Sequence, residues 1–179
     1  MQKFKRMSIQ LISLLLGELL ILFHNGVWSL KNKLIPMRDG FWKQLMVYVY
    51  EKKLQKAGSW IGYRSKFSGE PVFPHGIQGI FISHGAVIGS SCVIFQQVTI
   101  GSNTIVGHPK YGSPLIGDGC YLGAGAKIIG KVTLGNNVRV GANCVVVKDV
   151  PDNCVVVAQQ PRIIQKENLD NDYHEFTTE

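Results

Sequence analysis

Histidine and cysteine are the residues of this chain whose side chains could serve as bases, nucleophiles or metal ligands. The 179 residues include five histidines and four cysteines. No two cysteines have the CxxC spacing of a metal site and none lies beside a histidine, so cysteine nucleophile chemistry is not expected. His75, His84 and His108 lack the closely spaced pairs of a three-histidine zinc site, and we expect no metal. A neutral imidazole can act instead as a general base, and we assign no role to His24 and His174.

A six-residue period runs through the chain and decides where those side chains can lie. Aliphatic residues recur at this spacing in two runs, and a small or β-branched residue follows each one four positions later. An α-helix repeats every ~3.6 residues and a strand every two, so neither explains the period. The pattern predicts an all-β solenoid, a triangular prism in which the first residue of each hexad points inward and glycine relaxes many corners. Those first residues are Ile82, Ile88, Ile94, Ile100, Ile116, Leu122, Ile128, Leu134, Val140 and Val146.

Three of the cysteines fall on the small inward position of a hexad. Cys92, Cys120 and Cys144 stand where neighbouring hexads have Val, Ala or Thr. We therefore expect them to be small core residues in a reducing compartment.

The period is interrupted twice, and each interruption could hold a site. The solenoid is expected to begin near Ser59 with imperfect hexads, and its phase then slips by three residues between Phe73 and Ile82, around His75. The second break adds ten residues between Thr104 and Ile116, where prolines and glycines favour a projecting loop. A solenoid accepts insertions only at its corners, so both breaks should project from the prism.

Residues 1–58 form a separate basic and apolar segment. They carry all of the net charge of +7, because residues 59–179 have equal numbers of acidic and basic side chains. The apolar residues 11–23 leave three alternatives open: a secretory signal, a spanning helix, or a helix packed on the protein or in a membrane interface. We favour the third, since no cleavage site follows and Glu18 would cost ~2–3 kcal/mol inside a bilayer. Asp39 is expected to cap a second helix, from Phe41 to Lys56.

The expected organisation therefore has three parts. Residues 1–58 are the helical segment, residues 59–164 the solenoid, and residues 165–179 a polar C-terminal tail. A nucleic-acid partner is not expected, because the basic side chains are interleaved with an apolar helix and the solenoid is neutral.

Residues 74–164 resemble the left-handed β-helix acyltransferases of hexapeptide repeats, within them the serine acetyltransferase-like branch. The text that carries the resemblance is "FPHGIQGIFISHGAVIGSSCVIFQQVTIGSN", "GAGAKI" and "VVVKDVP". The left hand of the coil is implied by the resemblance, since the usual preference in parallel crossovers is right-handed. Members of the family transfer an acetyl group from acetyl-CoA to a hydroxyl or amine, directly and without a metal, and work as homotrimers with sites between neighbouring prisms.

The resemblance also implies roles for the histidines. His75 matches the family's general base, which would take a proton from an attacking alcohol. His108 lies in the loop where the family places residues that contact the acceptor, and we expect it to contact the substrate. For His84, at an outward corner of a regular hexad, we favour surface decoration or a helper role on the substrate side over catalysis.

The acetyl-CoA site is carried over by position in the same way. Backbone groups at Ala124 and Ala142 would bind the pantetheine arm, and Val147 and Lys148 would follow at the next corner. Lys148 and Arg162 would neutralise the nucleotide phosphates.

The acceptor is where the chain departs from serine acetyltransferases. Those enzymes place an Asp directly before the catalytic His and another upstream, and an Arg-His-Pro in the loop; this chain has Pro74, Ser59-Trp60 and Gly112-Ser113-Pro114. We therefore favour a sugar hydroxyl in surface polysaccharide biosynthesis, with serine O-acetylation as the alternative and a non-catalytic scaffold as the alternative of another class. We expect a cytoplasmic protein, and peripheral contact of residues 1–58 with the anionic inner membrane face is a further expectation.

Overall fold

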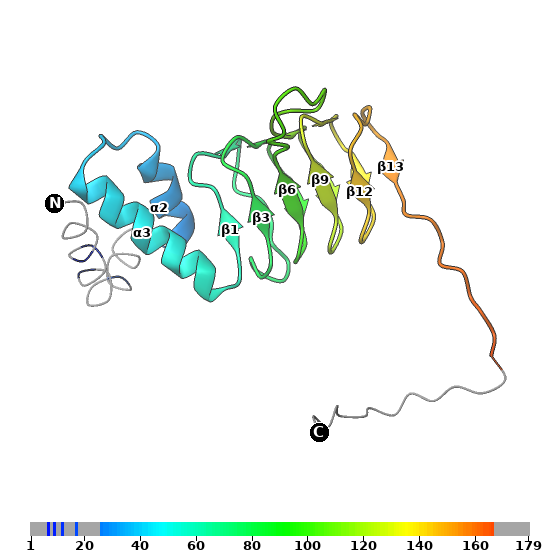
Figure 1. The fold of residues 1–179 in the computed structure, drawn as a ribbon, viewed down its shortest axis with the longest axis horizontal. Coiled ribbons are helices and arrows are strands. Elements are labelled where there is room, and N and C mark those ends of the chain that lie inside the picture. Colours follow the sequence, from blue (N-terminus) through cyan, green and yellow to red (C-terminus); the bar gives the residue numbers. More distant parts are fainter. Residues whose placement is uncertain (1–6, 8, 10–11, 13–16, 18–25, 167–179) are drawn as a thin grey trace, which may run out of the picture.

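The computed structural model describes residues 7, 9, 12, 17 and 26–166, in which two helices precede a long coil of short strands (Figure 1). The helices are α2 (Val27–Leu34) and α3 (Phe41–Lys56). The strands are β1 (Trp60–Ile61), β2 (Lys66–Phe67), β3 (Phe81–Ile82), β4 (Val87–Ile88), β5 (Val93–Ile94), β6 (Thr99–Gly101), β7 (Leu115–Ile116), β8 (Tyr121–Leu122), β9 (Lys127–Ile129), β10 (Thr133–Leu134), β11 (Arg139–Val140), β12 (Val145–Val146) and β13 (Val155–Val156).

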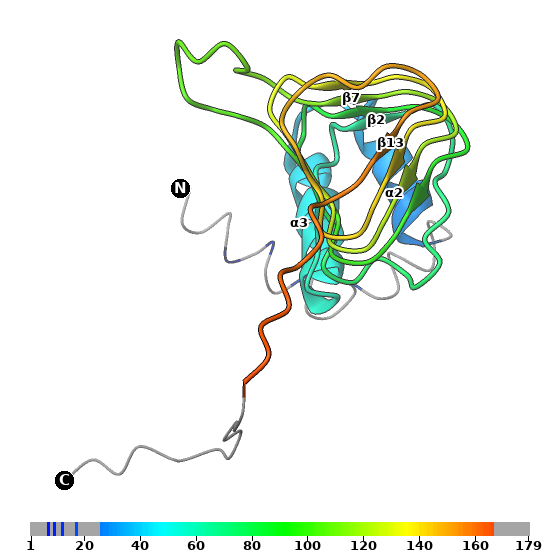
Figure 2. The same cartoon turned by 90° about the vertical axis from the view of Figure 1, so that its right-hand side faces the viewer.

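The strands form three parallel sheets that make the sides of a triangular prism (Figure 2). Sheet A has the order β1-β3-β6-β9-β12, sheet B the order β2-β4-β7-β10, and sheet C the order β5-β8-β11-β13. A regular turn takes eighteen residues, since Phe81 pairs with Thr99 in register. The predicted fold class, an all-β left-handed parallel β-helix of hexapeptide repeats with N-terminal helices, is thus confirmed.

The core consists of the residues that the period places inside. All ten first residues of the hexads are buried, nine of them with at most 2% of their surface exposed and Val146 with 4%. Cys92, Cys120 and Cys144 are buried beside them, as predicted. A hydrogen bond with Cys120 and burial raise the pKa of Cys92, so its thiol stays protonated in the core.

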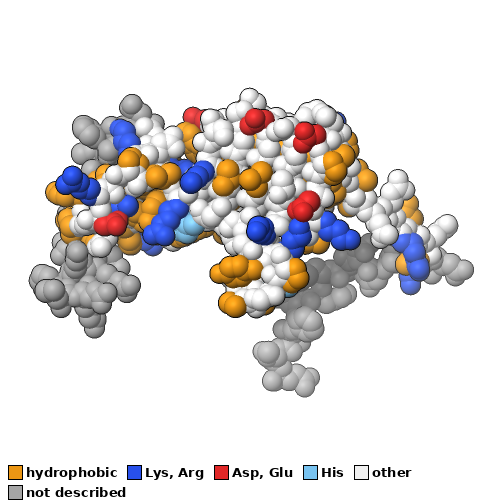
Figure 3. All heavy atoms as spheres, turned by 90° about the horizontal axis from the view of Figure 1, so that it is seen from above, with side chains coloured by type: hydrophobic (Ala, Val, Ile, Leu, Met, Phe, Trp, Pro, Cys, Tyr) orange, Lys and Arg blue, Asp and Glu red, His pale blue; other side chains and the backbone are white. Residues whose placement is uncertain are grey.

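Both breaks in the period appear as insertions at corners. The slip of three residues makes Trp60 pair with Phe81, twenty-one positions later. The insertion of ten makes Val87 pair with Leu115, twenty-eight positions later. Residues 102–114 form a projecting loop, closed at its base by paired backbone hydrogen bonds of 2.9 Å between Asn103 and Gly112. The exposed hydrophobic side chains Ile105, Val106 and Tyr111 belong to this loop, and hydrophobic atoms gather at its end in Figure 3.

Helices α2 and α3 pack on the first turn of the coil and share its core. The buried side chains of Leu34 and Leu54 lie in the same apolar cluster as Ile61 and Ile80 of the coil. The Tyr50 hydroxyl donates a hydrogen bond of 2.8 Å to the Ile61 carbonyl. Helices α2 and α3 therefore cover the end of the prism that precedes β3.

The sequence predicted the bounds of α3 correctly, but it did not predict the residue at the N-cap of this helix. Asp39 makes no capping hydrogen bond; it pairs instead with Lys43 at 2.9 Å, and Gly40 occupies the N-cap position. The short helix α2 was not predicted, because its eight residues are too few for a clear period. The apolar residues 11–23 lie mostly outside the described residues. Within the described part, no helix is long and apolar enough to cross a membrane.

Candidate active site

The corners of successive turns stack into three edges of the prism. The predicted site residues are distributed between two of these edges and the segment that follows β13. Edge CA joins sheets C and A and contains residues 73–80, 95–98, 123–126 and 141–144. Edge AB joins sheets A and B and contains residues 83–86, the projecting loop, 130–132 and 147–149. Edge BC joins sheets B and C.

His75 lies on edge CA, in the corner that the three-residue slip enlarges. Its side chain is exposed, and Nδ1 lies 2.7 Å from Oε1 of Gln96, which belongs to the next corner of the same edge. The imidazole also meets the Phe95 ring edge-on, with 5.5 Å between the ring centroids. The imidazole is thus contacted by two consecutive residues of one corner.

Backbone hydrogen bonds connect the corners of edge CA into a continuous column. Gln97 donates to the Gln78 carbonyl at 3.1 Å, Gly125 to the Gln96 carbonyl at 3.0 Å, and Asn143 to the Ala124 carbonyl at 2.9 Å. This column aligns His75 with Ala124 and Ala142, the residues predicted to bind the pantetheine arm. Among the described residues, no protein group accepts a hydrogen bond from the backbone N–H of Ala124 or Ala142. These two groups are free to donate to a ligand.

Edge AB holds the other predicted residues. His84 is wedged between Trp60 and Tyr63, with ring centroids 6.1 and 5.2 Å away, and burial followed by the charge of Arg64 lowers its pKa. A cavity of about 450 Å³ opens beside it, lined by Trp60, Phe81, Ser83, Thr99, Ser102 and Thr104 among others. The His84 Nδ1 lies 3.4 Å from the Arg64 backbone nitrogen, and His84 and His75 lie on different edges of the prism.

His108 lies within the projecting loop and helps to shape it. Its Nδ1 lies 3.0 Å from the Asn103 side-chain nitrogen and 3.0 Å from the Lys110 backbone nitrogen. Lys110 in turn forms an ion pair of 2.9 Å with Asp149, which ties the loop to the corner that contains Val147 and Lys148.

The residues predicted to bind acetyl-CoA therefore lie in three different parts of the chain's structure. Ala124 and Ala142 lie on edge CA, the exposed Val147 and Lys148 lie on edge AB, and the exposed Arg162 lies in the extended segment that follows β13. Within one copy of the chain the structure places His75 on the same edge as Ala124 and Ala142, two and three corners away along the stack, and it places His84, His108 and Lys148 on another edge.

Gln96 is the residue that the sequence analysis missed. The spacing contained the information needed to find it, because a turn of eighteen residues plus the slip of three places residue 96 directly beside residue 75. The same arithmetic would have shown that His75 and His84 lie on different edges.

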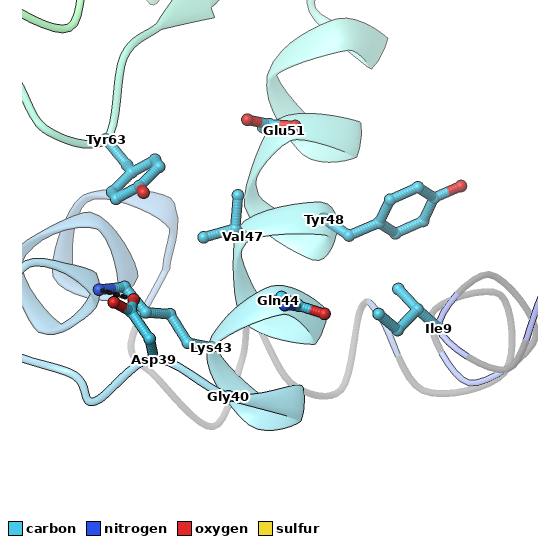
Figure 4. A pocket seen from close by; sticks show the side chains of 9 residues that line it. All are labelled: Ile9, Asp39, Gly40, Lys43, Gln44, Val47, Tyr48, Glu51 and Tyr63. Carbon is cyan, nitrogen blue, oxygen red and sulfur yellow. Dashed lines mark ion pairs between the residues drawn. The ribbon is translucent and has the colours of Figure 1, made fainter. Parts of the chain in front are cut away.

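A second cavity of about 570 Å³ lies at the helical end of the molecule (Figure 4). Side chains of α3, among them Gln44, Val47 and Glu51, line it together with Tyr63 of the coil. Burial raises the pKa of Glu51. None of the predicted site residues lines this cavity, and within the described residues no group of three or more His, Cys, Asp or Glu could hold a metal ion.

Comparison with known proteins gives one family and a consistent group of relatives. Residues 113–148 match the bacterial transferase hexapeptide family (six repeats). The chain is 32% identical over 100 residues to a serine acetyltransferase of Synechococcus elongatus, a match that covers 51% of this chain and 40% of the relative. The chain therefore spans well under half the length of that relative.

Solved structures show the same likeness. The structure of serine acetyltransferase isoform 3 from Entamoeba histolytica in complex with cysteine has a TM-score of 0.60 and 26% identity, covering 79% of this chain and 50% of that one. A serine acetyltransferase in complex with CoA has a TM-score of 0.53 and 31% identity, covering 63% of this chain and 44% of that one.

Proposed function

Because the chain belongs to the hexapeptide-repeat acyltransferases, in their serine acetyltransferase-like branch, we propose that it transfers an acetyl group from acetyl-CoA to a hydroxyl group. One observation carries the proposal. His75 lies on the same edge of the prism as the column of corners whose backbone N–H groups at Ala124 and Ala142 donate to no protein group within residues 26–166. A base and a row of free donors are thus aligned along one edge.

In the proposed reaction His75 acts as general base. Its imidazole takes the proton of the acceptor hydroxyl while the oxygen attacks the thioester carbonyl. The tetrahedral intermediate then expels the CoA thiolate, which regains a proton from the imidazolium. Backbone N–H groups that point at the developing oxyanion would stabilise it. The buried cysteines take no part, since none of Cys92, Cys120 and Cys144 is accessible to an acyl donor.

The residues proposed to bind acetyl-CoA are those that the resemblance to the family implies. We propose that Ala124 and Ala142 bind the pantetheine arm and that Lys148 and Arg162 neutralise phosphates. Because Val147, Lys148, His84 and His108 lie on edge AB, they can join His75 only if a neighbouring copy places its edge AB against edge CA. This requirement agrees with the homotrimer that the family implies.

The acceptor has two candidates. The relatives named above are serine acetyltransferases, so the comparisons favour L-serine over the sugar hydroxyl that the sequence favoured. A sugar hydroxyl remains the second candidate because of the surroundings of His75. Pro74 precedes it, and among the described residues its side-chain contacts are the neutral Gln96 and Phe95. A free amino acid needs partners for both of its charges, whereas a sugar needs neither.

Acceptor-dependent release of CoA thiol tests the proposal. Purified protein would be given acetyl-CoA with L-serine, nucleotide sugars or glycan repeats in parallel, and products identified by mass. We expect release of CoA to depend on one of these hydroxyl acceptors. Absence of acetyl transfer to every acceptor, with acetyl-CoA bound, would contradict the proposed function.

A further inference from the structure

The cavity of about 450 Å³ beside His84 on edge AB is lined by aromatic rings and hydroxyl groups. Small-molecule sites usually have volumes of about 300–1,000 Å³, so this one is large enough for a ligand. No Asp, Glu, Lys or Arg is among the described residues that line it. Burial, followed by the charge of Arg64, lowers the pKa of His84, so its imidazole is neutral at neutral pH. The cavity is therefore suited to a polar group without charge.

Two aromatic side chains form the apolar part of the wall. Trp60 of β1 and Phe81 of β3 are paired in register, and both line the cavity. Neighbouring strands lie ~4.8 Å apart, so one ligand can contact both side chains. An edge-on contact with the His84 ring, at 6.1 Å between centroids, restrains Trp60, and Phe81 has 47% of its surface exposed. Exposed aromatic faces of this kind can pack against the C–H groups of a sugar ring.

Hydroxyl groups form the polar part of the wall. Among the side chains that the structure describes, the Ser83 hydroxyl is the one buried polar group without a hydrogen-bond partner. Leaving a buried hydroxyl without a partner destabilises a folded protein, so such a group needs an explanation. Because Ser83 lines the cavity, a hydroxyl group bound there can satisfy it. Thr99 and Thr104 add further hydroxyls to the same wall.

Charged side chains of the neighbouring segments are engaged elsewhere. The Arg64 guanidinium donates a hydrogen bond of 3.1 Å to the Tyr63 hydroxyl, and Lys110 of the projecting loop is paired with Asp149. A free amino acid carries an ammonium and a carboxylate, and burying either one is costly unless an opposite charge receives it. The described lining residues offer neither partner, whereas a sugar ring needs only hydroxyl groups and an apolar face.

We therefore propose that this cavity binds the acceptor as an uncharged sugar ring, which packs against Trp60 and Phe81 and hydrogen-bonds to Ser83. The inference rests on the proposed function in taking the bound sugar to be the group that is acetylated, and it selects the sugar over L-serine. Because the cavity lies on edge AB, the ring would meet an acetyl-CoA bound at edge CA of a neighbouring copy.

Binding of methyl glycosides to the purified full chain tests the inference without acetyl-CoA. Saturation-transfer NMR titrations would use the methyl glycosides of glucose, galactose, mannose and N-acetylglucosamine, with L-serine as competitor. We expect at least one glycoside to bind and L-serine not to displace it. Phe81→Ala should weaken that binding by about tenfold, because the sugar face loses an apolar contact. Leu115→Ala, at an outward position of β7 with the same exposed fraction of 47%, is the matched control and should bind as the wild type does.

A second variant separates ligand binding from a structural role. Ser83→Ala removes the hydroxyl that has no protein partner, so it should not lower the Tm of the free protein, but it should weaken glycoside binding by about three- to tenfold. A structural hydroxyl would give the opposite result, a lower Tm with unchanged binding.

The outcomes distinguish this inference from the proposed function. No binding of any glycoside, unchanged binding in both Phe81→Ala and Ser83→Ala, or acetyl transfer to L-serine alone would overturn the inference. Glycoside binding that both variants weaken, together with no acetyl transfer to any acceptor, would overturn the proposed function and leave the sugar site in place.

Discussion

Lys31 is a buried cation at the junction between the helices and the coil. Only 1% of its surface is exposed, and Nζ donates to the Ser65 carbonyl at 2.6 Å and lies 4.7 Å from the centre of the Phe67 ring. Burial lowers its pKa from 10.5 to about 8. The folded protein therefore releases this proton at a lower pH than the unfolded chain does, and the unfolded chain binds more protons between these two values.

This difference makes stability depend on pH. Where the unfolded state binds more protons, the free energy of unfolding rises with pH, so it should increase from about pH 8 towards 10. Lys31→Met should abolish this increase, whereas Lys66→Met, at an exposed position of β2, should keep it. Urea unfolding at about pH 7 and pH 9.5 measures the effect. A rise of equal size in Lys31→Met and the wild type would show that Lys31 does not cause it.

At the scale of single residues, the sequence predicted correctly which side chains are buried, but it did not predict which residues contact one another. The period alone identified the inward positions and the three core cysteines, because a six-residue repeat fixes which side chains enter the prism. The contact of His75 with Gln96 is found only by adding the slip of three residues to the eighteen-residue turn, because the six-residue period alone does not relate one turn to the next. The predicted Asp39 cap is not observed, because the helix has Gly40 at its N-cap position and the Asp39 carboxylate pairs with Lys43.

At the scale of the elements, successive corners of the coil pack closely against one another. On edge BC, the corner glycines of successive turns approach so closely that a Cβ on Gly117 would lie 2.6 Å from the Gly135 carbonyl. Both contacting atoms are backbone, so neither can move aside without disturbing a turn. Side chains add a second column here, because Asp118 accepts from the Ser90 backbone at 2.6 Å and Asn136 from the Asp118 backbone at 2.9 Å.

Gly117→Ala should therefore destabilise the coil by about 1–3 kcal/mol. The matched control is Gly40→Ala before α3, where a new methyl group would meet nothing within 4 Å and the backbone is extended. Thermal unfolding compares the two. If Gly117→Ala unfolds at the same temperature as the control, the close stacking of edge BC does not require glycine at position 117.

At the scale of the whole molecule, the division into edges is the feature that matters for function. The sequence located both breaks and the residues in them, but the six-residue period alone does not assign His75 and the projecting loop to different edges. That result follows from counting corners around a three-sided prism after a slip of three and an insertion of ten. Helices α2 and α3, which belong to the segment 1–58, complete the core at one end of the coil.

The central claim is that edge CA is an acetyl-transfer site with His75 as its base. Turnover of acetyl-CoA by His75→Ala, with the acceptor that the wild type uses, tests it most directly. We expect kcat to fall by about a hundred- to ten-thousandfold while the affinity for CoA, measured by calorimetry, stays nearly unchanged, because the base is not one of the residues proposed to bind CoA. A variant that keeps more than about a tenth of the wild-type kcat would contradict the assignment.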